Sequence, residues 1–123
     1  MTLQLARLAN WENELQDYLE AKRDTDEPCA DFVAGGVAVI TGEDVRTHFR
    51  GRLSWVRDNL EAAVDEILEP RITAAARTGD VVLAHGSLGL CVGADALFVG
   101  LHDEQTGLTA VPMAEWEKAW TVG

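Results

Sequence analysis

Residues 29–41 constrain the fold of this chain more than any other stretch. They read Cys-Ala-Asp-Phe-Val-Ala-Gly-Gly-Val-Ala-Val-Ile-Thr, an almost uninterrupted apolar run that predicts a buried helix. Pro28 suits the first position of that helix, because its missing N–H would have no partner there, and Gly42 is a natural stop. The sulfur of Cys29 should therefore lie in the first helical turn.

This position gives Cys29 two alternative interpretations. A helix start collects unpaired backbone N–H groups and the positive end of the helix dipole, which favours a thiolate and lowers the pKa of a cysteine. Cys29 is thus a candidate nucleophile. Alternatively, Cys29 is a small buried hydrophobic residue, which is the commoner role of free cysteine. The acidic residues around it, Asp24, Asp26, Glu27 and Asp31, would repel a thiolate.

Two further helices are expected around this one. Leu8, Trp11, Leu15, Tyr18 and Leu19 recur at helical spacing, with Asn10 as a possible N-cap. Residues 54–68 follow the same period, and Pro70 closes that segment. Inside the cysteine helix, Gly35 and Gly36 each cost about 1 kcal/mol relative to alanine. We therefore expect another part of the chain to pack very close to the backbone there.

From Thr78 onward the pattern changes to short apolar runs separated by Gly and Asp turns. Such runs predict antiparallel strands joined by tight hairpins, at residues 81–84, 88–93, 96–100 and 108–112. A short helix at 114–118 and a last strand at 119–122 complete the pattern. Helices followed by a meander indicate an α+β fold, in which N-terminal helices pack on a small antiparallel sheet. At 123 residues, we expect one domain over 1–123.

Composition limits the partners. The chain has 10 basic and 21 acidic residues, a formal charge of −11, so nucleic acids and anionic membranes are poor partners. The longest apolar run is far shorter than the roughly 20 residues of a membrane span. The N-terminus lacks the pattern of a secretory signal, so we expect synthesis in the cytoplasm and free thiols at Cys29 and Cys91. Neither a metal site nor a cofactor is indicated.

Several motifs in this order carry a family resemblance. Cys29 opening a central helix, Gly-Asp-Val-Val at 79–82 and Leu-Gly-Leu-Cys-Val-Gly at 88–93 resemble the NlpC-like branch of papain-fold cysteine peptidases. The whole pattern, including Thr-Gly-x-Asp at 41–44, Arg-Gly-Arg at 50–52 and a closing Ala-Trp at 119–120, more closely resembles small tail-associated proteins of phages and prophages that are distantly related to those peptidases. The resemblance implies a papain-like (NlpC-like) fold over nearly the full chain.

The chain departs from the peptidase pattern at the general base. The histidine that begins the second strand in those peptidases is replaced here by Ser87, and a serine cannot accept the thiol proton at neutral pH. His85, two residues earlier, is a candidate substitute base if the strand begins early, or else a hairpin-loop residue. His48 and His102 are expected in loops.

Three functions follow as hypotheses. The first is a catalytically inactive structural component of a phage or phage-derived tail tip or baseplate, located in the virion tail and bound to hub or other tail proteins. The second is an active cell-wall peptidase that cleaves peptidoglycan with Cys29 as nucleophile and His85 as base. The third is a generic binding or assembly module with no phage connection. Trp116 and Trp120 are candidates for partner contact, because aromatics are enriched at interface hot spots, or else for burial against the sheet.

Overall fold

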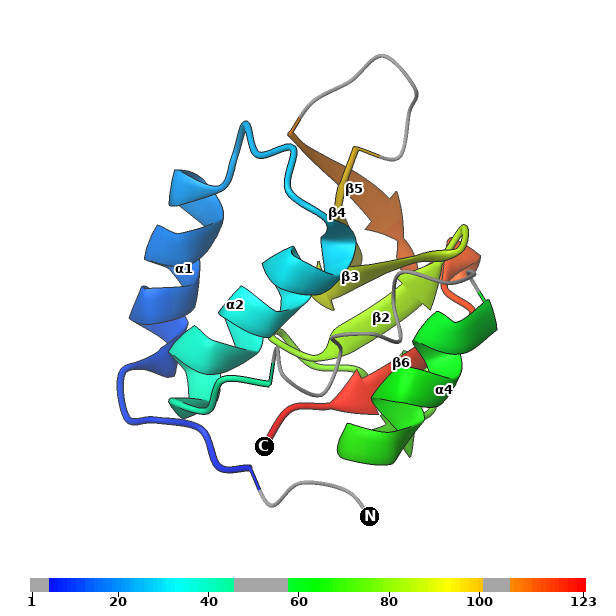
Figure 1. Ribbon diagram of the computed structural model, residues 1–123, viewed down its shortest axis with the longest axis horizontal. Helices are drawn as coiled ribbons and strands as arrows, with labels where there is room; N and C mark the ends of the chain where they lie inside the picture. Colours follow the sequence, from blue (N-terminus) through cyan, green and yellow to red (C-terminus); the bar gives the residue numbers. More distant parts are fainter. Residues whose placement is uncertain (1–4, 46–57, 101–106) are drawn as a thin grey trace.

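The computed structural model describes residues 5–45, 58–100 and 107–123 (Figure 1). Its helices are α1 (Trp11–Ala21), α2 (Cys29–Thr41) and α4 (Asp58–Ile67), with short 3-10 helices at Thr73–Ala75 and Met113–Glu115. The strands are β1 (Glu69–Arg71), β2 (Val81–Ala84), β3 (Ser87–Cys91), β4 (Asp95–Val99), β5 (Leu108–Pro112) and β6 (Lys118–Thr121). The expected α+β class is confirmed.

The strands form one antiparallel sheet in the order β1-β6-β2-β3-β4-β5. The hairpins from β2 to β5 follow the predicted meander, and β6 returns across the molecule to lie between β1 and β2. The β2–β3 turn is tight: Ala84 pairs with Ser87, and His85 and Gly86 both have positive φ, 52° and 74°. This is the backbone that a two-residue type I′ hairpin needs, and histidine is among the residues that tolerate it.

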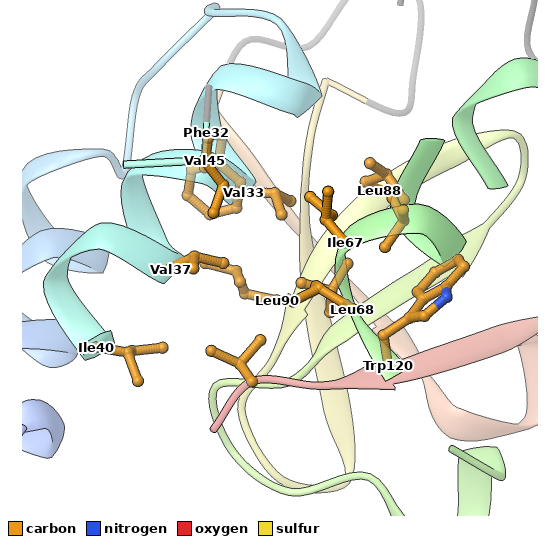
Figure 2. Close-up of a cluster of buried hydrophobic side chains, with 14 of the residues drawn as sticks. Phe32, Val33, Val37, Ile40, Val45, Ile67, Leu68, Leu88, Leu90 and Trp120 are labelled. Atoms are coloured by element: carbon orange, nitrogen blue, oxygen red, sulfur yellow. The ribbon is translucent and has the colours of Figure 1, made fainter. Parts of the chain in front are cut away.

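Helices α2 and α4 pack on the same face of the sheet. Their apolar side chains meet those of β2, β3 and β6 in one buried cluster (Figure 2). The members labelled in Figure 2 are Phe32, Val33, Val37, Ile40, Val45, Ile67, Leu68, Leu88, Leu90 and Trp120. Helix α1 packs on the outer side of α2, so α2 lies between α1 and the sheet (Figure 1).

The opposite face of the sheet carries a second buried cluster. It consists of Val82, Ala84, Cys91, Ala96, Phe98, Val111, Trp116 and Ala119. Because side chains alternate along a strand, neighbouring residues of β2 and β3 serve different clusters. Leu88 and Leu90 face α2, whereas Cys91 faces away from it.

The close packing expected at Gly35 and Gly36 is confirmed. A Cβ atom at Gly35 would lie 2.8 Å from Cζ of Tyr18 and closer still to its hydroxyl, and one at Gly36 would overlap Leu90. The Tyr18 hydroxyl donates a hydrogen bond to the carbonyl of Phe32 at 2.7 Å. The two glycines therefore let α1 approach α2 on one side and β3 approach it on the other.

Several local expectations need correction. Pro28 is the N-cap of α2 and not its first helical residue, and Asn10 occupies the N-cap position of α1 without a side-chain hydrogen bond. Pro70 does not simply close a helix, because it lies in β1 and pairs with Trp120 of β6. The short helix expected at 114–118 is a 3-10 helix at Met113–Glu115, and β6 already begins at Lys118.

Some expectations concern residues beyond those described. These are the start of the third helix at residue 54, the Arg-Gly-Arg motif at 50–52, and the histidines His48 and His102. In the described part, no helix combines the length and apolar character that crossing a bilayer requires.

Candidate functional site

Cys29 is the first residue of α2, and its place in the first helical turn is the one that the sequence predicted. Pro28 holds an extended backbone with ψ of 145°, and its carbonyl accepts the N–H of Phe32 at 3.1 Å, which closes the first helical turn. The Cys29 side chain is partly buried and packs against the cluster beneath α2. The sulfur thus lies where α2 meets β3.

The electrostatic surroundings do not activate this thiol. Burial raises the pKa of Cys29, and the backbone N–H groups of Leu88, Ala30 and Cys29 itself lower it by less. The carboxylate of Asp31 adds a further upward contribution. The expected preference of a helix start for a thiolate is therefore outweighed by desolvation, and the thiol is protonated at neutral pH.

No general base is hydrogen-bonded to the sulfur in the described residues. His85 lies in the β2–β3 turn, and its Nε2 is 2.8 Å from Oε1 of Glu115. Both side chains are about half exposed, at 51% and 47%. A hydrogen bond between an imidazole and the Cys29 sulfur is absent from this part of the chain, so the structure does not assemble the Cys29–His85 pair.

Ser87 lies on the wrong face of the sheet for a base. It precedes Leu88, whose side chain packs beneath α2, and by alternation Ser87 shares the opposite face with Cys91. The group of β3 that reaches Cys29 is the backbone N–H of Leu88. That group is a hydrogen-bond donor and cannot accept a proton.

The two candidate partner-contact tryptophans are both core residues. Trp120 is fully buried, and Trp116 is 7% exposed. The indole of Trp116 donates to the carbonyl of Val111 at 3.0 Å, and that of Trp120 donates to Oδ1 of Asp65 at 2.8 Å. A role in partner contact would require either ring to leave the core.

A buried carboxylate, Asp80, forms a polar centre that sequence reasoning missed. Its side chain is fully buried, and Oδ1 accepts hydrogen bonds from Arg7 at 3.0 Å and from the N–H of Val122 at 3.1 Å. Oδ2 accepts the N–H of Arg77 at 2.9 Å and lies 3.7 Å from the guanidinium of Arg71. The sequence does indicate a buried charge here, because in Gly-Asp-Val-Val the acidic Asp80 comes directly before a fully apolar strand.

A second polar centre joins α4 to β6. Asp65 receives the indole N–H of Trp120, and its two oxygens lie 2.8 and 3.0 Å from the ammonium group of Lys118. Lys118 also lies 3.1 Å from Glu61. The Lys118 and Trp120 hydrogen bonds lower the pKa of Asp65 against the opposing effect of burial.

The charged side chains of these two centres are paired with one another and connect segments of the fold. In the residues that the structure describes, no group of three or more His, Cys, Asp or Glu side chains is placed to hold a metal ion. What remains at Cys29, among the residues that the structure describes, is a protonated thiol beside a strand with no acceptor for its proton.

Residues 6–122 match the family DUF6950, described as a domain of unknown function. The chain belongs to this family. The matched residues include Arg7 and Val122, which both donate hydrogen bonds to Asp80. These contacts of Asp80 therefore lie within the DUF6950 domain. Comparisons with curated proteins and with solved structures give no match.

Proposed function

We propose that this DUF6950 protein is a catalytically inactive structural component of a phage or phage-derived tail tip or baseplate, built on a degenerate NlpC-like (papain-like) peptidase fold. In this role it is made in the bacterial cytoplasm and carried in the virion tail, where it contacts other tail-tip, baseplate or hub proteins. The proposal for the tail rests on the sequence resemblance. The proposal for inactivity rests on the geometry around Cys29.

The observation that carries the inactivity is that no proton acceptor for the Cys29 sulfur is found in residues 5–45, 58–100 and 107–123, the part that the structure describes. A cysteine peptidase needs a base within about 2.6–3.2 Å of the sulfur, held in turn by a third group. Here Leu88 faces the helix start, Ser87 faces the other way, and His85 is bonded to Glu115. Burial also keeps the pKa of Cys29 high, so a thiolate does not form at neutral pH without that base.

The fold is consistent with a scaffold role. The described helix, sheet and terminal segments are tied together by a buried polar centre at Asp80 and a partly exposed one at Asp65. Such internal connections favour a rigid domain that presents a fixed outer surface.

The inactivity is tested on purified full-length protein with bacterial peptidoglycan sacculi. We expect no release of soluble fragments, and no difference between the wild type and Cys29→Ala. A known cell-wall peptidase serves as the positive control for the sacculi. Hydrolysis by the wild type that disappears in Cys29→Ala would overturn the assignment and support an active peptidase.

The tail role is tested separately in the organism that encodes the chain. We expect the protein to co-purify with tail particles at a constant ratio to the major tail proteins, as measured by quantitative mass spectrometry. Particles that lack the chain while it accumulates in the cytoplasm would contradict the tail role and leave the inactivity untouched.

A further inference from the structure

Three arginine residues meet at the buried carboxylate of Asp80. Arg7 precedes α1, Arg71 ends β1, and Arg77 lies in the loop before β2. The side chain of each donates a hydrogen bond to one of three successive residues near the end of the chain, in the order Thr121 from Arg71, Val122 from Arg7 and Gly123 from Arg77. Three of the six basic residues that the structure describes therefore lie together, in what is named here the arginine cluster.

The arginine cluster holds more positive than negative charge. Asp80 pairs with Arg7 at 3.0 Å and lies 3.7 Å from Arg71, whereas Arg77 makes no ion pair within the described residues. A second carboxylate, Glu69, lies on the same side of β1 as Arg71 but is exposed and forms no ion pair in that part of the chain. Burial lowers the pKa of Arg7, Asp80 acts to raise it, and the charges of Arg77 and Arg71 lower it further. Three guanidiniums thus share two carboxylates and repel one another.

Two of these guanidiniums have N–H groups to spare. A guanidinium carries five N–H donors. Arg71 donates to the carbonyl of Ala75 at 3.2 Å and to the hydroxyl of Thr121, and Arg77 donates to the carbonyl of Gly123. Arg77 is exposed, and the side chain of Arg71 is 27% exposed, so a ligand can reach both. Their existing hydrogen bonds hold them in place, which reduces the entropy that binding would cost.

We propose that the arginine cluster binds an acidic peptide segment of a partner protein, in which carboxylates at alternate positions pair with Arg71 and Arg77. The residues that hold these two guanidiniums, Thr121 and Gly123, are at most about 7 Å apart along the chain. Alternate side chains of an extended segment have a similar spacing. A guanidinium suits a carboxylate because two N–H groups can meet two oxygens. Arg7 contributes charge only, since its nitrogens bond within the molecule. The inference goes beyond the proposed function and stands without it.

A short acidic segment suits the arginine cluster better than a long polyanion. The chain has a formal charge of −11, so its other surfaces repel an extended nucleic acid or an anionic bilayer. At physiological salt, charges on the surface act over about 8 Å. A segment of a few residues therefore responds mainly to the arginines beside it.

The test uses the full chain labelled with ¹⁵N and two capped synthetic peptides. One has the sequence Glu-Ser-Glu-Ser-Glu, and the other replaces each glutamate with glutamine. We expect the acidic peptide to shift the side-chain Nε–H signals of Arg71 and Arg77 and the backbone signal of Gly123, with affinity falling as salt is added. The glutamine peptide should leave these signals unchanged. Equal responses to both peptides, shifts confined to other surfaces, or equally tight binding of inorganic phosphate would overturn the proposal.

The same titration is repeated with the chain extended by Gly-Ser after Gly123, so that no terminal carboxylate lies next to Arg77. We expect both forms to bind the acidic peptide with similar affinity. Binding by the extended form alone would show that a terminal carboxylate, and not a partner, occupies the arginine cluster.

Two matched variants separate the cluster from general charge. Arg77 and Arg23 are both exposed, so Arg77→Gln and Arg23→Gln remove the same charge, one at the cluster and one beyond the far end of α1. The backbone N–H of Arg77, which bonds to Asp80, is kept in the first variant. We expect Arg77→Gln to weaken peptide binding about fivefold or more, and Arg23→Gln to change it less than twofold. Equal weakening by both would mean that net charge alone attracts the peptide.

A third variant should strengthen binding, so its effect cannot arise from a folding defect. Glu69 is exposed and lies on the same side of β1 as Arg71, so Glu69→Gln removes a charge that repels the peptide. We expect this variant to bind about twofold more tightly or better, whereas Glu14→Gln on α1 should change the affinity less. An equal effect of the two variants would contradict the placement of the peptide at the arginine cluster.

Discussion

At Cys29, two properties of the α2 start act on the sulfur in opposite directions. Backbone N–H groups at the helix start and from Leu88 stabilise a thiolate, while burial against the core destabilises it. Burial has the larger effect, so the pKa of the thiol is raised. A helix start alone is therefore insufficient to activate a cysteine when no cation or base accompanies it.

Alkylation kinetics should show this directly. Under native conditions at pH 7, we expect iodoacetamide to modify Cys29 more slowly than free cysteine, and the rate should increase through a pKa above the ordinary thiol value. The two thiols are followed separately by peptide mass spectrometry, and Cys91, whose pKa is also raised by burial, serves as the internal reference. In denaturant both should react at the ordinary rate. Faster native labelling of Cys29 than of free cysteine at pH 6 would identify an activated nucleophile.

Sequence reasoning located the thiol but not the two polar centres that join distant segments of the fold. Cys29 and its helix were readable because they depend on local order along the chain. The roles of Asp80 and Asp65 were not, because their partners are far away in sequence: Val122 lies 42 residues from Asp80, and Trp120 lies 55 residues from Asp65. From the sequence, an acidic residue next to a buried strand indicates a buried charge, but it does not identify the residues that pair with that charge.

At the scale of elements, α1 and α2 approach each other through a glycine. Gly35 faces the ring of Tyr18, which is held in place by the hydrogen bond from its hydroxyl to the carbonyl of Phe32. Because the ring is fixed, it cannot move away from an added methyl group without losing that bond. The helix propensity gained by replacing glycine is thus opposed by overlap between the helices.

We expect Gly35→Ala to destabilise the fold by up to about 2 kcal/mol, since an overpacking cost of about 1–3 kcal/mol is only partly offset by the roughly 1 kcal/mol gained in helix propensity. Urea unfolding measures the free energy of unfolding. In a Tyr18→Phe background the nearest atom is gone, so the same change should cost clearly less. Identical costs in both backgrounds would show that Tyr18 is not the obstacle.

The contact between α4 and β6 should depend on pH. Burial acts to raise the pKa of Asp65, but the hydrogen bonds from Lys118 and Trp120 prevail and lower it. A lowered pKa in the folded state means that this carboxylate adds stability above its unfolded pKa, about 3.9, and that the contribution is lost as pH falls through the folded value. The ionised form of Asp65 thus holds the two elements together.

Accordingly, Asp65→Asn should destabilise the protein near pH 6, and the difference from the wild type should shrink as the pH falls below about 4. Urea unfolding between pH 3 and pH 6 measures this. Glu115→Gln, which removes the exposed contact with His85, is the control and should change stability by less than about 1 kcal/mol throughout. A difference that stays constant over this range would show that the charge of Asp65 does not stabilise the contact.

Element prediction succeeded where apolar runs were bounded by turn residues and failed where pairing between distant segments decides the structure. The apolar run at 29–41 and the apolar runs of β2 to β5 are of the first kind, and the structure confirms them. Strand β1 has three residues including Pro70, and its existence depends on pairing with β6 at the other end of the chain. The sequence predicts a short helix at 114–118, but only one 3-10 turn forms before β6 pairs with β2.

At the scale of the whole molecule, the two ends of the described chain meet at Arg7. Its Nε donates to the carbonyl of Val122 at 2.8 Å, Nη1 to that of Thr78 at 2.7 Å, and Nη2 to Asp80 at 3.0 Å. Gly123 packs against the backbone of the same residue, where a Cβ atom would lie 3.1 Å from the nitrogen of Arg7. One side chain therefore joins the N-terminal segment, the start of β2 and the end of the chain.

This arrangement requires a guanidinium and not merely a positive charge. The three acceptors lie in different directions, and the planar fork of arginine reaches them from fixed positions, whereas lysine offers a single nitrogen. We expect Arg7→Ala to cost about 3 kcal/mol, since it leaves the buried carboxylate of Asp80 without its closest cation, and Arg7→Lys to recover less than half of that loss. Urea unfolding measures both, with the exposed Arg23→Ala as a control expected to change stability by less than about 0.5 kcal/mol. Stability of Arg7→Lys equal to that of the wild type would show that charge alone holds the ends together.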